Sequence, residues 1–166
     1  MNPDGLLFVS YLKIEVGNMA KVLFGAGCFW GVEEAFKKLE GVVETKAGYS
    51  GGTYPNPTYD DICRGDTGHA EVVKVVYDPE IISLEELLNC FWEIHDPTTL
   101  NRQGPDIGHQ YRSAVFCFKE DDLEQVMRSK ERIESKLDTP VVTEVMLVKD
   151  FYEAEEYHQC YFEKNK

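Results

Sequence analysis

The stretch LFGAGCFWGVEEAF, residues 23–36, places one cysteine between a short apolar run and an amphipathic one. The apolar run, KVLFGAG at 21–27, ends in glycines and predicts a strand. After it, apolar residues recur at helical spacing and predict one buried helix face. The members of that face are Val32, Ala35, Phe36 and Leu39. Cys28 is therefore expected between a strand and a helix.

The same periodicities extend along the chain. Further strands are predicted at 42–49, 70–78, 111–118 and 140–148. Further helices are predicted at 84–95, 121–137 and 150–162, the first capped by Ser83 with Glu86 and the last by Asp150. This order indicates an α+β fold, a two-layer mixed sheet with helices on one side and a split βαβ, ferredoxin-like core.

Two turn-rich stretches interrupt this pattern, at 50–69 and 96–110. The first is too long for a plain connector, so we expect it to be functional. Residues 1–18 are interpreted as an N-terminal extension that need not be ordered, because Met19 stands just before the first strand. Residues 19–166 are expected to form a single catalytic domain.

The composition restricts the function. Thirty acidic and seventeen basic side chains give a net charge of −13, which disfavours nucleic-acid binding. No apolar run approaches the roughly 18 residues that cross a membrane, and the N-terminus lacks the basic start of a signal peptide. We therefore expect a cytoplasmic protein without a membrane contact.

The five cysteines have no regular spacing and their number is odd, which argues against a disulfide framework. In a reducing compartment they are expected to be free thiols. Spacing such as C-x2-C is absent, so a zinc module using Cys63, His69 and other cysteines is a minor alternative. Cys90 and Cys117 lie in apolar patterns and are interpreted as core residues.

Cys28 stands out among these thiols because of its place at the predicted helix N-terminus. Unpaired N–H groups and the helix dipole stabilise a thiolate there, so the pKa of Cys28 is expected to lie below about 8.5. The flanking glycines allow a reactant to approach. The alternative is a small hydrophobic side chain that fills the corner between strand and helix.

Four ordered blocks of the sequence resemble the A class of peptide methionine sulfoxide reductases. They are GCFWGVEEAF, GYSGGTYPNPTYDDICRGDTGHAEVV, FWEIHDPTTLNRQGPDIGHQYRS and, more weakly, AEEYHQCYF. Together they cover nearly all of residues 21–162. The resemblance implies reduction of the S epimer of methionine sulfoxide, free or in proteins, to methionine, with thioredoxin as the electron donor and without a metal or cofactor.

This chemistry needs a nucleophile, a proton donor and an apolar pocket for the methyl group. Cys28 supplies the nucleophile, and Phe29 and Trp30 offer the apolar wall. The resemblance implies that Glu71 is the acid, with Tyr59 and Tyr111 as its hydroxyl partners. Glu71 is also out of pattern at the start of an apolar strand, although an edge position facing water would explain it equally.

Asp106 corresponds to the family residue that holds the substrate backbone, although alone it would be a turn residue. The family usually has asparagine before this aspartate; here Pro105 removes a backbone N–H. The pair His95 and Asp96 is interpreted as structural, because the reaction needs no imidazole base.

Oxygen transfer would leave a sulfenic acid on Cys28, which a second thiol condenses into a disulfide. The resemblance favours Cys160 as this resolving thiol, although burial in a helix would keep it from Cys28. Cys63 is the other candidate, and an external thiol a further one. Rival interpretations are an acidic binding module with an inactive site and a cysteine hydrolase. The candidate bases of the hydrolase are His69, His95, His109 and His158.

Overall fold

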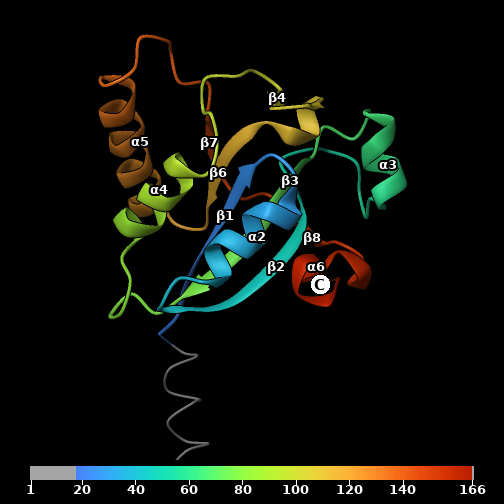
Figure 1. The fold of residues 1–166 in the computed structure, drawn as a ribbon, viewed down its shortest axis with the longest axis horizontal. Helices are drawn as coiled ribbons and strands as arrows, with labels where there is room; N and C mark the ends of the chain where they lie inside the picture. Colours follow the sequence, from blue (N-terminus) through green and yellow to red (C-terminus); the bar gives the residue numbers. More distant parts are fainter. Residues whose placement is uncertain (1–17, 166) are drawn as a thin grey trace, which may run out of the picture.

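The computed structural model describes residues 18–165, so all but the last residue of the expected N-terminal extension lies outside it. Its first half contains β1 (Ala20–Ala26), α2 (Phe29–Lys37), β2 (Val42–Ser50), α3 (Tyr59–Arg64), β3 (Ala70–Tyr77) and α4 (Leu84–Glu93). Its second half contains β4 (Arg102–Gln103), β5 (Asp106–Ile107), η1 (His109–Tyr111), β6 (Ser113–Cys117), α5 (Glu120–Glu134), β7 (Glu144–Leu147), β8 (Phe151–Glu153), η2 (Glu156–His158) and α6 (Tyr161–Lys164). Figure 1 shows their arrangement.

The main sheet has six strands in the order β7-β6-β1-β3-β2-β8. Only the β6–β7 pair is parallel, which makes the sheet mixed. β3 lies between β1 and β2 and is antiparallel to both, so α2 joins two strands that are not neighbours. The strands and helices of this α+β fold thus bring the start of α2 close to the first residues of β3 (Figure 1).

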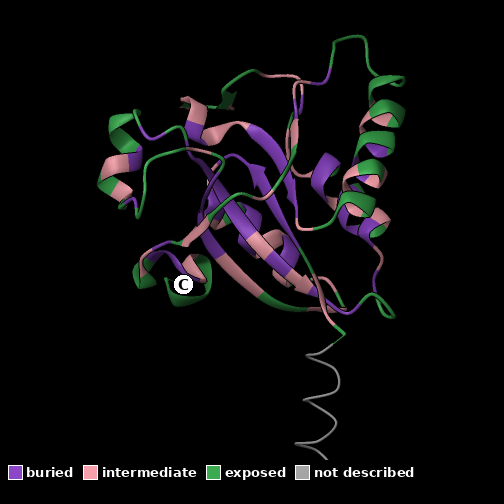
Figure 2. Ribbon diagram, turned by 180° about the vertical axis from the view of Figure 1, so that it is seen from behind, coloured by how far each residue is buried: buried purple, intermediate pink, exposed green. Residues whose placement is uncertain are grey.

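The three longest helices among the described residues pack on one face of the sheet. Side chains of α2, α4 and α5 share one apolar core with alternate residues of the central strands, including Phe24 and Val73. The opposite face has a smaller cluster, to which no helix of residues 18–165 contributes (Figure 2, seen from behind). Its buried members are Leu23, Ala70, Val72, Ala114 and Phe116.

The sheet is strongly curled. If it were flat, five spacings of about 4.8 Å would separate β7 from β8 by about 24 Å. Only residues 148–150 connect these strands, and such a connection spans at most about 15 Å. Val148 and Phe151 cover the smaller cluster instead. Curling therefore brings the two edges of the sheet toward each other across the face without helices.

The C-terminal prediction was wrong: residues 150–162 do not form one helix capped by Asp150. Phe151 and Tyr152 pair with β2 and become the edge strand β8, where aromatic residues suit a pleated surface and the ladder satisfies backbone groups. Gly48 permits this pairing, because a Cβ there would collide with the Phe151 ring. The local sequence shows no trace of this long-range partner.

Three further predictions need smaller corrections. The stretch 50–69 contains the helix α3, which Thr58 and Asp61 begin with a reciprocal capping box. The strand predicted at 140–148 is limited to β7, and the stretch 96–110 contains the hairpin β4–β5. Ser83 does cap α4, by accepting a hydrogen bond from the Glu86 backbone N–H.

Candidate active site

Cys28 is the N-cap residue of α2, as the sequence predicts. Gly27, between β1 and Cys28, has φ +94°, and a Cβ there would lie 2.9 Å from the Gln103 side chain. A glycine is thus required both for the turn and for the close approach of the β4–β5 hairpin. This turn leaves the thiol half-buried at the start of the helix.

The expected low pKa of Cys28 is wrong for the protein without substrate. Burial is the main cause that raises the pKa to about 11, and the carboxylates of Glu71 and Asp106 raise it further. The backbone N–H groups of Trp30 and Gly31 act in the opposite direction, as the helix N-terminus predicts. Desolvation and two acids outweigh the helix, so the resting nucleophile is a neutral thiol.

Glu71 lies close to this thiol and is almost completely buried, with 2% of its surface exposed. One carboxylate oxygen, Oε1, accepts a hydrogen bond of 3.2 Å from the Phe29 backbone N–H. Burial raises the pKa of Glu71 to about 7, Asp106 adds to this increase, and the Phe29 N–H opposes it. Glu71 therefore can hold a proton at neutral pH, and it is not an edge residue facing water.

The hydroxyls of Tyr59 and Tyr111 belong to the same electrostatic neighbourhood. Tyr59 is the first residue of α3, and Tyr111 ends η1. Burial is the main cause that raises both pKa values, that of Tyr111 to about 12, and Glu71 contributes to each. Both tyrosines are thus neutral hydrogen-bond donors around the acid.

Asp106 enters from the β4–β5 hairpin. It begins β5 and pairs with Gln103, the residue that covers Gly27. Its charge raises the pKa values of Cys28, Glu71 and Tyr111. The hairpin therefore carries a carboxylate to the nucleophile and the acid.

Phe29 and Trp30 have different environments. Phe29 is 1% exposed and packs against the rings of Tyr49 and His158, at centroid distances of 5.7 and 5.1 Å. Trp30 is partly exposed and stacks on Tyr161 at 3.6 Å, with ring planes only 5° apart. Trp30 thus offers more aromatic surface to a substrate, while Phe29 supports the base of the site.

The C-terminal segment plays a structural part here that the sequence did not predict. Nδ1 of His158 accepts a 3.0 Å hydrogen bond from the Trp30 indole N–H, and its ring lies 4.5 Å from that of Tyr59. Glu155 accepts hydrogen bonds from the Tyr49 hydroxyl and the Tyr59 backbone N–H. The signal was present in the block AEEYHQCYF, but a helix at 150–162 would have directed these side chains elsewhere.

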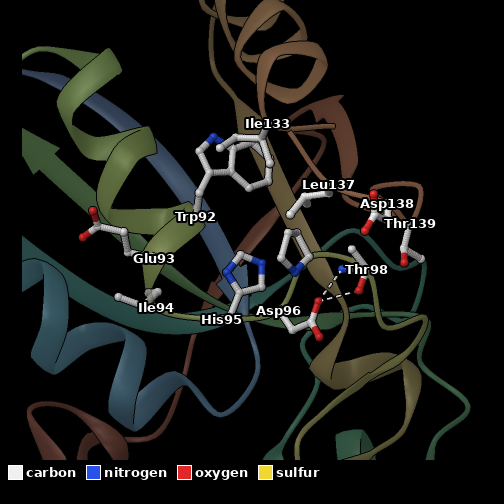
Figure 3. Close-up of a pocket in the computed structure, with 11 residues that line it drawn as sticks. Trp92, Glu93, Ile94, His95, Asp96, Thr98, Ile133, Leu137, Asp138 and Thr139 are labelled. Carbon is white, nitrogen blue, oxygen red and sulfur yellow. Dashed lines mark hydrogen bonds between the residues drawn. The ribbon is translucent and has the colours of Figure 1, made fainter. Parts of the chain in front are cut away.

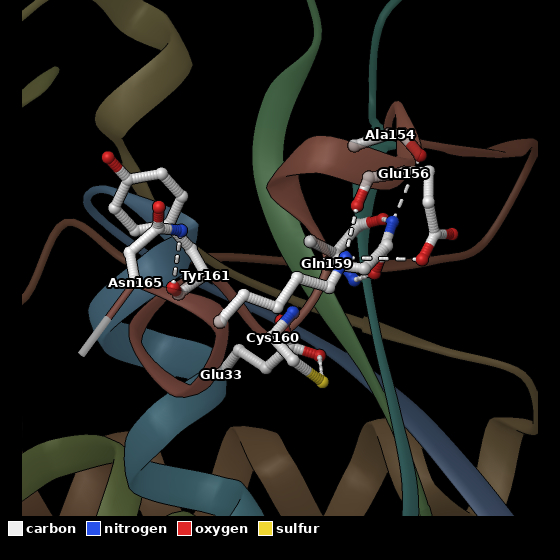
Figure 4. Close-up of polar contacts among 9 residues, drawn as sticks. Glu33, Ala154, Glu156, Gln159, Cys160, Tyr161 and Asn165 are labelled. Atoms are coloured by element: carbon white, nitrogen blue, oxygen red, sulfur yellow. Dashed lines mark hydrogen bonds and ion pairs between the residues drawn. The ribbon is translucent and has the colours of Figure 1, made fainter.

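Cys160 is held on the flank of α2. Its backbone N–H donates to Oε1 of the buried Glu33 at 2.7 Å, and its sulfur lies 3.9 Å from Oε2 (Figure 4). Next to it, the Gln159 amide bonds both the N–H and the carbonyl of Ala47 and so continues the edge of β2 beyond β8. Cys160 is not buried inside a helix, but these contacts anchor it.

Cys63 lies on α3 and is exposed. Unlike Cys160, it interacts with residues of the proposed site. Its side chain hydrogen-bonds the Tyr59 hydroxyl and helps to raise the pKa of Tyr59. Cys63 also raises the pKa of Tyr111. It therefore lies near the hydroxyls of Tyr59 and Tyr111, whose pKa values Glu71 also raises.

His95 belongs to a different region, next to a cavity of about 670 Å³ between the ends of α4 and α5 (Figure 3). Its Nδ1 contacts the Phe91 carbonyl at 2.6 Å, and its Nε2 the Ser113 hydroxyl at 2.7 Å. Burial lowers the pKa of His95 to about 4. Both ring nitrogens thus have structural partners, and none of the proposed site residues lines this cavity.

Comparison with known proteins agrees with the blocks of sequence. Residues 20–166 match the family model of peptide methionine sulfoxide reductases. The chain belongs to this family. It is 54% identical over 147 residues to a peptide methionine sulfoxide reductase MsrA of Methanothermobacter thermautotrophicus, a match that covers 87% of each chain. The protein is accordingly a methionine sulfoxide reductase enzyme.

Solved structures show the same fold. Reduced Mxr1 of Saccharomyces cerevisiae aligns with a TM-score of 0.86 and 41% identity, over 90% of this chain and 87% of that one. Mxr1 in complex with Trx2 aligns with a TM-score of 0.64 and 31% identity, over 87% and 86%. In the described residues 18–165, no helix is long and apolar enough to cross a membrane.

Proposed function

We propose that this enzyme reduces the S epimer of methionine sulfoxide, free or in proteins, through a sulfenic acid on Cys28. The observation that carries the proposal is a buried acid with a pKa of about 7 hydrogen-bonded to the first residue of the helix that Cys28 caps. A nucleophile and a proton donor thus adjoin the same helix terminus.

The residues can perform a balanced reaction. The sulfur of Cys28 attacks the sulfoxide while Glu71 donates a proton to its oxygen, and the thiol proton restores the acid. The attack forms a transient bond between the two sulfurs, and the protonated oxygen then moves to Cys28 as a sulfenic acid. This transfer breaks both the S–O bond of the substrate and the bond between the sulfurs, and it releases methionine. This exchange requires a neutral thiol and a protonated acid. The pKa of about 11 keeps the Cys28 thiol neutral, and the pKa of about 7 lets Glu71 hold a proton at neutral pH.

The surrounding side chains suit the substrate. Tyr59 and Tyr111 can hydrogen-bond the sulfoxide oxygen, and Trp30 together with Phe29 can form an apolar wall for the methyl group. Asp106 would hold the substrate backbone. Such a wall excludes charged sulfur compounds, because their desolvation is costly.

We further propose that Cys160 attacks the sulfenic acid, forms a disulfide with Cys28 and releases water, after which thioredoxin reduces the disulfide. Mxr1, a relative with this fold, has been crystallised with Trx2, which supports a thioredoxin partner. Cys160 must first leave Glu33. Cys63 is the alternative, because its side chain already contacts Tyr59.

A single turnover on racemic substrate without reductant tests both steps, by counting methionine formed and thiols lost. One methionine and two thiols indicate an internal resolving cysteine. Cys160→Ser should then lose multiple turnover with thioredoxin but still form one equivalent of methionine, while the matched Cys63→Ser variant keeps both. Unchanged steady-state turnover of Cys160→Ser would remove Cys160 from the mechanism.

The rival cysteine hydrolase needs a histidine beside Cys28. In the part of the chain that the structure describes, no histidine hydrogen-bonds Cys28. His69 bonds the Gly52 N–H and the Tyr54 carbonyl, and His158 bonds Trp30. Replacing the four histidines one at a time should therefore leave the chemical step intact, and loss of that step in one variant would favour the hydrolase.

We also propose a split βαβ core, a single domain and a cytoplasmic location. The position of β3 between β1 and β2 supports a split βαβ core. The shared core of the described residues supports a single domain over 19–166. Five free cysteines agree with a reducing, cytoplasmic compartment.

A further inference from the structure

The turn at residues 155–158 touches two separate parts of the proposed site. At its first residue, Oε1 of Glu155 accepts a 3.0 Å hydrogen bond from the Tyr49 hydroxyl. Oε2 accepts one of 2.9 Å from the backbone N–H of Tyr59. At its last residue, Nδ1 of His158 accepts a hydrogen bond from the Trp30 indole N–H. One short turn thus contacts residues from β2, α3 and α2.

Glu155 links the position of Tyr59 to the strand pair that carries Glu71. Tyr59 begins a six-residue helix inside a long connection, so few backbone contacts define its position. Tyr49, in contrast, lies in the sheet directly opposite Glu71. By bonding both tyrosines, the carboxylate of Glu155 ties the start of α3 to the strand pair that carries the acid.

His158 connects Trp30 with the aromatic side chains at the base of the site. It is 1% exposed, and its ring packs on Phe29 and Tyr59 while Nδ1 bonds Trp30. Burial lowers the pKa of His158, so Nδ1 is unprotonated at neutral pH and able to accept. This bond sets the orientation of the indole plane that Tyr161 covers on one side.

We propose that Glu155 and His158 are positioning residues with separate tasks. Glu155 acts through Tyr59 on proton donation, and His158 acts through Trp30 on binding of the substrate methyl group. The inference rests on the proposed function of the site, and neither side chain needs to touch the substrate.

The two tasks predict changes in different kinetic constants, kcat for Glu155 and KM for His158. The Glu155 carboxylate accepts hydrogen bonds from two donors, the Tyr49 hydroxyl and the Tyr59 backbone N–H. Glu155→Gln replaces one accepting oxygen by an NH₂ group, which repels a donor, so Tyr59 should move. We expect kcat to fall about 10-fold or more, because small misplacements of a reacting group are costly, with KM changed by less than about 2-fold. His158→Phe keeps an aromatic ring at this position but removes the nitrogen that accepts the Trp30 hydrogen bond. We expect KM to rise about 10-fold, with the single-turnover rate at saturating substrate within about 3-fold of the wild type.

Matched variants separate positioning from general destabilisation. Glu156→Gln changes the neighbouring, exposed glutamate, whose side chain bonds only Lys164 among the described residues, and should leave both constants unchanged. His158→Asn places an amide oxygen near Nδ1 and should restore much of the KM. In a Tyr59→Phe background, Glu155→Gln should cost much less in kcat than alone, because both changes act on the same hydroxyl.

The proposal is overturned if both variants change kcat and KM together in proportion to a fall in the midpoint of thermal unfolding. Additive effects of Glu155→Gln and Tyr59→Phe would overturn the part that concerns Glu155. Failure of the proposed function looks different, since the wild type and Glu156→Gln would then form no methionine from the S epimer.

Discussion

Glu71 and His95 both lie in regions where the chain departs from regular apolar patterns, and both have pKa values far from their ordinary range. His95 has a hydrogen-bond partner on each ring nitrogen, and Ser113 continues this network to Thr143. Glu71 accepts one backbone hydrogen bond and lies near a second acid and a thiol.

This difference distinguishes a structural group from a reactive one. His95 is stabilised in a single, neutral form. Glu71 is held near the midpoint of its titration, where proton transfer in either direction costs little at neutral pH. The 670 Å³ cavity adjoins His95 and not the thiol, so the presence of a cavity does not identify the reactive group.

The largest effect should come from the nucleophile beside Glu71. Cys28→Ser should lower the rate of methionine sulfoxide reduction by about 10⁴-fold or more, because the hydroxyl is a far weaker nucleophile than sulfur. The assay measures methionine formed with dithiothreitol as reductant. Cys90→Ser, a partly buried thiol on α4, is the control and should keep most activity; substantial reduction by Cys28→Ser would remove the basis of the comparison.

The next effect separates the two titratable groups directly. Glu71→Gln should lower kcat by about 10²- to 10⁴-fold, the usual contribution of a general acid, whereas His95→Gln should change it by less than about 3-fold. In the wild type, kcat should fall as pH rises through about 7, because Glu71 loses its proton. A pH profile flat from 6 to 9 would contradict the role of this acid.

The buried Glu71 should also lower the free energy of unfolding at high pH, where its carboxyl group is ionised. Its pKa is about 7 in the folded protein and about 4.5 when unfolded, so the folded state binds more protons between these values. Stability contributed by the protonated form is therefore complete below pH 4.5 and lost as pH rises through 7. Glu71→Gln should raise the free energy of unfolding by about 3 kcal/mol at pH 8 and by almost nothing at pH 4.5, measured by urea denaturation.

His95 should show the smallest effect, with the opposite sign. Its pKa is about 4 when folded and about 6.5 when unfolded, so the unfolded state binds more protons in that interval. Its contribution to stability is present above pH 6.5 and is lost progressively as pH falls toward 4. Between pH 7 and 5 the loss should be about 1–2 kcal/mol, and His95→Gln should flatten this dependence. An equal slope in the variant would assign the effect to other groups.

Local patterns were sufficient for much of this molecule. The change from apolar run to helical period located Cys28, and the acid at the start of an apolar strand was a sign of Glu71. The resemblance added Tyr59, Tyr111 and Asp106. These inferences depend on neighbours in the chain or on whole motifs, which a sequence contains.

The C-terminal segment could not be predicted in this way. Phe151 and Tyr152 become a strand only because β2 offers an unpaired edge and Gly48 leaves room for the ring. Glu155 and His158 then meet Tyr59 and Trp30, which precede them by about a hundred residues or more. Such contacts arise from curvature and strand order, which no local period encodes.

By itself, the sequence determined where the thiol stands, which side chains accompany it and which family the chain resembles. Only the tertiary structure decided the protonation states, because they depend on burial and on charges brought together from distant segments. The helix N-terminus alone favours a thiolate at Cys28, but desolvation and the carboxylates of Glu71 and Asp106 reverse that preference.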